Sequence, residues 1–195
     1  MEAAVKTDRR EVLLDAAIVV VAERGMRGLT HRAVETQAGL PHGSTTYYFG
    51  TRQDLVIALM RHLAERGRAS IEPIARQLTL TLADRSRELD IDQICDGLVA
   101  WIDASAQMEL ARYELQVTGA RDPEMKQLMT ETCDIFRQMC EPIVIACGSS
   151  DPARDSSVVQ AGVDGFMFKR LTNNGMTDEA IKRGIRVLLE GIAND

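Results

Sequence analysis

Side chains that can hydrogen-bond to phosphates and to base edges cluster between residues 30 and 52. Thr30 and the run 44–46 supply hydroxyl groups, and His42 and Tyr47 supply polar aromatic groups. Hydroxyls bind both phosphate oxygens and bases, and a threonine methyl can contact the methyl group of thymine. The chemistry that these residue types favour is the binding of DNA.

The charge around this cluster is positive, although the chain as a whole is acidic. The 195 residues carry a formal net charge of −6. Residues 1–70 hold ten Lys or Arg against eight Asp or Glu, whereas residues 71–195 hold 13 against 21. Within 24–52, four arginines accompany a single acid, Glu35, which leaves a charge of +3. A basic face on an acidic body fits phosphate binding at one end, and a chance excess of arginine is the alternative.

Two short helices joined by a tight turn would hold the cluster in place. Thr30 is a good N-cap for a helix that ends near Ala38, and Gly39 permits the left-handed backbone of a sharp turn. A third short helix is expected over 41–48. The sequence therefore predicts a helix-turn-helix whose second helix, with 42–47 on its exposed side, enters the major groove.

The rest of the chain also has helical spacing and lacks the sustained alternation typical of strands. A first helix is expected after Asp8 and ends at Gly25, and a fourth helix starts at Thr51. Beyond these we expect a polar connection over 79–92 and helices over 92–118, 122–147, 155–173 and 177–192, with a kink or an early stop at Pro142. The fold class predicted from this spacing is all-α.

Residues Gly25 to Leu55 follow the pattern Gly-x(4)-Thr-x(3)-Val-x(3)-Ala-Gly-Leu-Pro-x-Gly-Ser-x(3)-Tyr-Phe-x(2)-Arg-x-x-Leu. This pattern resembles the N-terminal domain of the TetR family of bacterial transcriptional regulators. The resemblance implies a helix-turn-helix DNA-binding domain over 1–50, with the fourth helix leading from residue 51 into the body. It implies that the all-helical body, 51–195, binds a small-molecule effector and forms a homodimer, and that the effector relieves repression.

Several residues match positions that contact DNA in that family. The resemblance places Thr30, Tyr47 and Arg52 on backbone phosphates, and His42 and Gly43 at the front of the recognition helix, close to the bases. The DNA-binding residues expected in full are Thr30, His31, Arg32, His42, Gly43, Ser44, Thr45, Thr46, Tyr47 and Arg52.

Two apolar stripes in the last two helices are expected to form the homodimer interface. They consist of Val159, Val163, Phe166 and Met167, followed by Ile181, Ile185, Leu188 and Ile192. A single short recognition helix contacts few bases, whereas a two-fold dimer reads both halves of a palindromic operator in double-stranded DNA. The alternative is that these stripes only complete the core of one chain.

Aromatic and methionine side chains in the middle of the chain are candidates for binding the effector. The resemblance suggests a cavity there, with Tyr113 and Glu114 orienting the ligand. The candidate set is Trp101, Met108, Tyr113, Glu114, Phe136 and Met139. The alternative is that they are ordinary core residues.

The four cysteines, at positions 95, 133, 140 and 147, include no CxxC pair and have no histidine nearby in the sequence. The last three recur every seven residues, which predicts one stripe of a single helix. Reduced cysteine is a small and commonly buried hydrophobe, so core packing is favoured, with a redox role or a soft-metal site as the alternative.

Other classes of protein find little support in the sequence. No apolar run is long enough to span a membrane, and no signal peptide is expected, so we predict a cytoplasmic protein with no membrane partner. GxSxG, P-loop, HExxH and dinucleotide-binding motifs are all absent. We therefore predict a protein that is not an enzyme and needs neither cofactor nor metal. A helix-turn-helix regulator that acts through protein partners, without a small-molecule ligand, remains the alternative.

Overall fold

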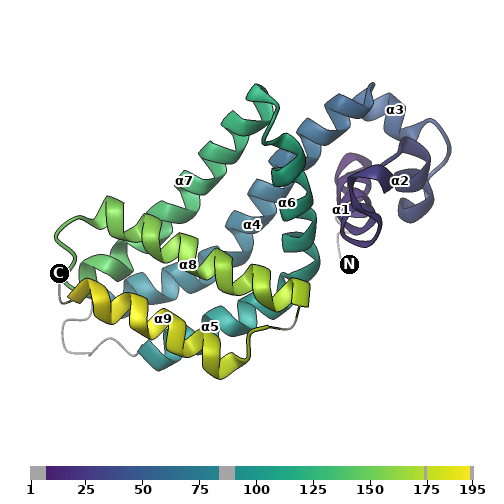
Figure 1. Ribbon diagram of the computed structural model, residues 1–195. Coiled ribbons are helices and arrows are strands. Elements are labelled where there is room, and N and C mark those ends of the chain that lie inside the picture. Colours follow the sequence, from purple (N-terminus) through teal and green to yellow (C-terminus); the bar gives the residue numbers. More distant parts are fainter. Residues whose placement is uncertain (1–7, 84–90, 174, 194–195) are drawn as a thin grey trace, which may run out of the picture. The chain divides into compact units, whose positions relative to one another are not determined.

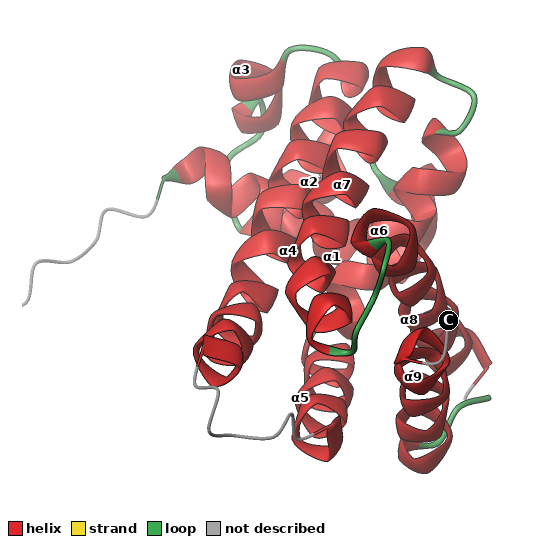
Figure 2. Ribbon diagram, turned by 90° about the vertical axis from the view of Figure 1, so that its left-hand side faces the viewer, coloured by secondary structure: helices red, strands yellow, loops and turns green. Residues whose placement is uncertain are grey.

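Helices joined by short loops make up the computed structural model, which describes residues 8–83, 91–173 and 175–193 (Figure 1). In chain order they are α1 (Arg9–Gly28), α2 (His31–Ala38), α3 (Ser44–Phe49), α4 (Arg52–Ala83), α5 (Ile91–Ala104), α6 (Ala106–Gly119), α7 (Pro123–Ala146), α8 (Pro152–Asn173) and α9 (Asp178–Ala193). The three described ranges contain no strand (Figure 2). The predicted all-α fold is confirmed.

The described residues form two compact units. The first contains the chain up to Gly67 together with Gln107–Thr130, and the second contains Arg68–Ala106 and the chain from Glu131 onward. The compact units therefore do not divide between residues 50 and 51, where the sequence suggested a domain boundary. The physical reason is that the first turns of α4 belong to the core of the first unit. The assignment of DNA binding to 1–50 and of effector binding to 51–195 stays a prediction.

Local signals set both ends of α1. The carboxylate of Asp8 accepts a hydrogen bond from the N–H of Arg10 at 2.9 Å, which satisfies a donor that the helix itself cannot. Gly25 has φ of 64°, and this left-handed conformation interrupts the helix before its last residues. The predicted start after Asp8 is confirmed, whereas the helix predicted to end at Gly25 is only interrupted there and ends at Gly28.

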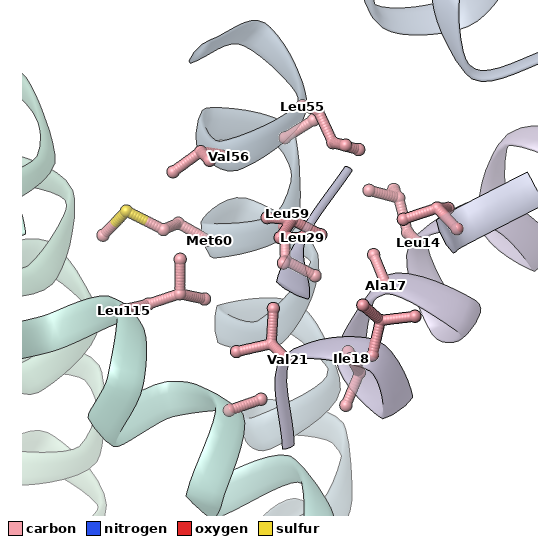
Figure 3. Close-up of a cluster of buried hydrophobic side chains, with 14 of the residues drawn as sticks. Leu14, Ala17, Ile18, Val21, Leu29, Leu55, Val56, Leu59, Met60 and Leu115 are labelled. Atoms are coloured by element: carbon pink, nitrogen blue, oxygen red, sulfur yellow. The ribbon is translucent and has the colours of Figure 1, made fainter. Parts of the chain in front are cut away.

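Apolar faces of α1, α4 and α6 form the core of the first unit (Figure 3). The side chains labelled there are Leu14, Ala17, Ile18 and Val21 of α1, Leu55, Val56, Leu59 and Met60 of α4, Leu115 of α6, and Leu29 between α1 and α2. A leucine side chain that is fully buried stabilises the fold by about 1.5–3 kcal/mol. Because α2 packs on α1 and α3 packs on α2, this core supports the two short helices.

Three boundaries in the rest of the chain differ from prediction. The helix expected over 92–118 is two helices, because the chain breaks at Ser105, whose buried hydroxyl donates to the carbonyl oxygen of Trp101 at 2.7 Å. The first part of the polar connection expected over 79–92 is the last turn of α4, and residues 84–90 lie outside the described ranges. Pro142 lies inside α7, which continues to Ala146 instead of stopping early.

In the second unit α9 packs against both α8 and α5. Glycine permits the close approach of α8 and α9, since a Cβ at Gly162 would lie 2.4 Å from Leu188, and one at Gly184 would lie 2.4 Å from Phe166. Arg170 of α8 donates to Asp103 of α5 at 2.7 Å and to Asp178 of α9 at 2.6 Å. One guanidinium therefore joins all three helices.

Candidate nucleic-acid interface

The turn between α2 and α3 depends on one threonine and one glycine. The hydroxyl of Thr30 accepts the N–H of Ala33 at 3.1 Å and so caps α2, as predicted. Gly39 has φ of 64°, and a Cβ at this position would meet nothing within 4 Å. Backbone conformation, and not lack of space, therefore requires glycine at the predicted turn.

The third helix begins later than expected. The sequence suggested a start at Pro41, but α3 runs from Ser44 to Phe49, because Gly43 has φ of 88° and the helix starts only after it. The carbonyl oxygen of Pro41 accepts from the Ser44 hydroxyl at 2.6 Å and from the Ser44 N–H at 3.2 Å. Residues 41–43 thus form a turn that leads into the helix.

A buried carboxylate, which sequence reasoning missed, lies behind the start of α3. Oε1 of Glu35, on α2, accepts the backbone N–H groups of Gly43 and Thr45, each at 3.0 Å. Oε2 lies 3.0 Å from Nδ1 of His42. The one signal in the sequence was an acid beside Val34, in a predicted helix whose other residues are basic or neutral.

Hydrogen bonding keeps Glu35 ionised despite its burial. Burial alone would raise the pKa of the carboxyl group. The N–H of Thr45, the imidazole of His42 and the N–H of Gly43 outweigh that effect and hold the pKa below its ordinary value. The carboxylate therefore acts as an acceptor at neutral pH.

Most of the predicted DNA-contacting side chains lie on the exposed side of α2 and α3. Thr30, Arg32, His42 and Thr46 are exposed, and Tyr47 is 83% exposed. The DNA contacts expected of these residues stay predictions.

The neighbouring predicted residues are less exposed. Ser44 and His31 are half-buried, and the imidazole Nδ1 of His31 lies 3.0 Å from Oγ1 of Thr46. The prediction that Thr45 lies on the exposed side is wrong. Its side chain is fully buried, because the six-residue helix turns this position toward α2, where its hydroxyl donates to the carbonyl oxygen of His31 at 3.4 Å.

Arg52 has structural partners that the sequence did not suggest. Its Nε donates to the carbonyl oxygen of Leu29 at 3.1 Å, and its Nη2 donates to that of Met26 at 2.7 Å. Both carbonyl groups lie at the end of α1, so the guanidinium links the start of α4 to the α1–α2 connection. The phosphate contact expected of Arg52 stays a prediction, and this link is an additional role.

The six predicted effector-binding residues are divided between the two units. Trp101, Phe136 and Met139 belong to the second unit, and the other three, Met108, Tyr113 and Glu114, belong to the first. The Nε1–H of Trp101 donates to the hydroxyl of Ser70 at 3.0 Å.

Glu114 makes a hydrogen bond within the first unit. Its carboxylate accepts the N–H of Met26 at 3.3 Å, just after the break in α1. Met108 packs against the core of the first unit. The effector contacts expected of these two residues stay predictions.

Half of the predicted dimer residues lie inside the chain's own core. Val159, Met167, Ile181 and Ile185 are buried in the second unit, which corrects their assignment to an intermolecular surface. The other four, Val163, Phe166, Leu188 and Ile192, are half-buried. Large apolar side chains that are exposed on these helices include Val158, Phe168 and Val187.

Only two of the three cysteines expected on one helical stripe are in α7. Cys133 and Cys140 lie on that helix, and Cys147 lies in the turn after it. Burial raises the pKa of the Cys140 thiol to about 11, with a smaller contribution from the charge of Asp164. The thiol of Cys140 is therefore protonated at neutral pH and behaves as a packing group. Across the described residues, no three His, Cys, Asp or Glu side chains come together in a way that could hold a metal ion.

The geometry of α1–α3 defines the class of the protein, which is a helix-turn-helix DNA-binding protein. Comparison with known families agrees. The profile described as "Bacterial regulatory proteins, tetR family" matches residues 13–59, and the profile "Tetracyclin repressor-like, C-terminal domain" matches residues 85–194. The chain belongs to the TetR family of transcriptional regulators, whose members are DNA-binding regulators and not enzymes. Within the described ranges, no helix has both the length and the apolar character needed to cross a membrane.

Individual relatives are similar over most of the chain. The HTH-type transcriptional regulator BetI of Paraburkholderia phymatum is 28% identical over 172 residues, which cover 83% of this chain and 80% of that protein. The multidrug binding protein EbrR, solved with imidazole, is 28% identical with a TM-score of 0.67, covering 93% of this chain and 94% of that one. A TetR-family member from Streptomyces coelicolor is 26% identical with a TM-score of 0.72, covering 93% and 98%.

Proposed function

We propose that this regulator is a repressor that binds a palindromic operator as a homodimer and is released by a small-molecule effector. The observation that carries the proposal is the exposure of Thr46 and Tyr47 on α3, of His42 in the turn before it, and of Arg32 on α2. This face combines groups that hydrogen-bond to bases with groups that bind phosphate.

We assign the contacts on this face by chemistry and exposure. His42 and Thr46 read base edges, while Thr30, Arg32 and Tyr47 bind backbone phosphates. Gly43 and Ser44 allow the start of α3 to approach the DNA closely. His31 and Thr45 support the interface from behind, and Arg52 contacts phosphate from the start of α4.

A dimer is needed because α3 has only six residues and reaches few bases. The exposed faces of α8 and α9 offer a surface for it. On α8, Val158, Ala161, Gly165 and Phe168 are all exposed and recur at intervals of three or four residues, and on α9 Val187 is 59% exposed. This spacing forms one apolar stripe along a helix, as a helical dimer interface requires. Val163 and Ile192, which are half-buried, would flank the stripe.

A cationic aromatic compound is the effector class that we propose. Structures of EbrR, 25% identical to this chain, contain ethidium in one case and proflavin in another. Residues 71–195 carry a net charge of −8, and Trp101, Phe136 and Met139 bring aromatic and thioether groups to the second unit. Aromatic rings and acidic surroundings favour flat cations.

The test is the selection of bound sequences from random duplex DNA with the full-length chain. We expect an inverted repeat whose half-sites are separated by about one helical turn, roughly 34–36 Å, or somewhat more. Binding to it should weaken steeply with salt, because counterions are released from phosphates. Enrichment of no sequence, or of a single non-repeated half-site, would contradict the proposal.

The effector is tested on the selected operator. Ethidium and proflavin should raise the melting temperature of the free protein and release it from the operator. Because both dyes also bind DNA, the melting temperature is measured without DNA. Failure of both dyes and of a broader ligand screen, with operator binding intact, would favour a regulator that acts through protein partners.

A further inference from the structure

We propose that Glu35 is a positioning residue that fixes the hydrogen on the imidazole ring of His42 and thereby decides which base His42 reads. The inference builds on the proposed function, in which His42 contacts a base. Glu35 itself cannot touch DNA, because its side chain is only 4% exposed, whereas that of His42 is 72% exposed. The pair therefore joins a buried carboxylate to an imidazole that can reach DNA.

The carboxylate of Glu35 fixes the ring through Nδ1. Oε2 lies 3.0 Å from Nδ1 of His42, and Oε1 is occupied by the N–H groups of Gly43 and Thr45. An ionised carboxylate only accepts hydrogen bonds, so the atom facing it must carry a hydrogen. When the ring is neutral, Nδ1 is therefore the nitrogen that carries the hydrogen, and Nε2, on the far side of the ring from Glu35, is a bare acceptor.

A bare nitrogen at the front of the recognition helix has a definite preference in the major groove. Cytosine offers its N4 amino group and adenine its N6 amino group as donors. Guanine offers N7 and O6, and thymine offers O4, all of which are acceptors that cannot pair with a bare Nε2. Glu35 thus makes His42 select cytosine or adenine at one position of each half-site.

Replacing Glu35 with glutamine separates this role from a structural one. The side chain keeps its shape, and its amide oxygen can still accept from Gly43 and Thr45. Its NH₂ group then faces Nδ1 of His42 and donates to it, so the hydrogen of the ring moves to Nε2. His42 becomes a donor at Nε2, and its preference should change to guanine or thymine.

The first experiment needs no DNA. The ¹⁵N chemical shifts of the His42 imidazole are measured at the alkaline end of their own pH titration, so that the ring carries a single hydrogen. We expect hydrogen on Nδ1 in the wild-type chain and on Nε2 in Glu35→Gln. Hydrogen on Nε2 in the wild-type chain would overturn the proposal, whatever the protein does with DNA.

The second experiment selects bound sequences from random DNA at the same pH, with the wild-type chain, Glu35→Gln, His42→Ala and the double variant. We expect one position per half-site to change from cytosine or adenine to guanine or thymine in Glu35→Gln, by about fivefold, which is the size of one hydrogen bond. The rest of the motif should be unchanged. In the double variant, Glu35→Gln should add nothing to His42→Ala.

The outcomes distinguish a failure of the proposed base contact of His42 from a failure of the positioning role of Glu35. If His42→Ala leaves the motif unchanged, the base contact assigned to His42 under the proposed function is wrong. If His42→Ala changes one position but Glu35→Gln only weakens binding to all sequences equally, Glu35 merely anchors α3, and the proposal is overturned. Thermal denaturation of each variant confirms that the first unit remains folded during selection.

Discussion

Arg52 donates from Nη2 to the carbonyl oxygen of Met26 across 2.7 Å, so the first residue of α4 is fastened to the end of α1. The same guanidinium reaches Leu29, just before α2. A residue that the family resemblance assigns to phosphate binding therefore also holds the helix-turn-helix on the rest of the first unit. The two roles can be separated, because only one of them requires the forked geometry of arginine.

Arg52→Ala should lower the free energy of unfolding by about 1 kcal/mol, because two carbonyl groups lose a charged donor at a partly exposed site. Operator affinity should fall equally for all sequences. Arg52→Lys restores the charge but not the two-pronged contact, so it should recover part of the affinity and little of the stability. Chemical denaturation and binding titrations measure the two effects.

The matched control is Arg32→Ala, which removes the same charge from an exposed position on α2. It should weaken DNA binding and leave stability within about 0.5 kcal/mol of wild type. Equal stability of Arg52→Ala and Arg32→Ala would show that the contacts to Met26 and Leu29 contribute nothing measurable.

Substitutions on the exposed stripe of α8 and α9 test the dimer. Phe168 is 49% exposed and Val187 is 59% exposed. Phe168→Glu and Val187→Glu should each shift the protein from dimer to monomer in sedimentation, because each buries a charge in an apolar interface. Operator affinity should fall with the dimer.

Val117→Glu is the control for this experiment. Val117 on α6 is an exposed apolar residue of the first unit, outside the proposed interface. The same change there should leave the sedimentation coefficient unchanged. Dimers that survive both Phe168→Glu and Val187→Glu would exclude the exposed stripe as the interface.

Local sequence signals correctly predicted helix caps and turns, which depend on interactions within a few residues. Thr30 caps α2, and Gly39 turns the chain, because a threonine before a helical run and a glycine after it act within a few residues. Thr51 and Asp54 cap α4 in the same way, with the N–H of each accepted by the side chain of the other, at 3.1 and 3.2 Å. None of these signals depends on what packs against the helix.

Predictions that depend on the packing partner were less accurate. An apolar stripe predicts which face of a helix is covered, but not whether the same chain or a second copy covers it. Ile181 and Ile185 were therefore assigned to a dimer interface, although they lie in the core of the second unit. Glu35 was missed for a related reason, because only the folded turn brings Gly43 and Thr45 to its carboxylate.

The ionised state of Glu35 makes the stability of the first unit depend on pH. Its pKa in the folded chain lies below the ordinary value of 4.5, so ionised Glu35 stabilises the fold above that pH. The stabilisation is lost as the pH falls through the lower folded value, where the carboxylate takes up a proton in the native state as well. The difference in melting temperature between wild type and Glu35→Gln should therefore be largest at neutral pH and shrink below pH 4.5.

Glu23→Gln provides the comparison, since it removes the same charge from an exposed position on α1. Its melting temperature should follow that of the wild type across the acid range. A wild-type advantage over Glu35→Gln that persists unchanged into strong acid would mean that the carboxylate is not what stabilises the turn.

The thiol of Cys140 should react slowly in the folded protein. Its pKa of about 11 lies well above that of an ordinary cysteine, about 8.5, and only the thiolate is nucleophilic. At pH 8 the thiolate fraction is therefore lower by roughly two orders of magnitude, and alkylation by iodoacetamide should slow by about tenfold, because the more basic thiolate is also the more nucleophilic. Peptide mass spectrometry over a time course follows each cysteine separately, with the urea-unfolded chain as the reference. Rapid native alkylation or reversible oxidation of Cys140 would instead support the redox alternative, because a thiol buried for packing is protected from both reactions.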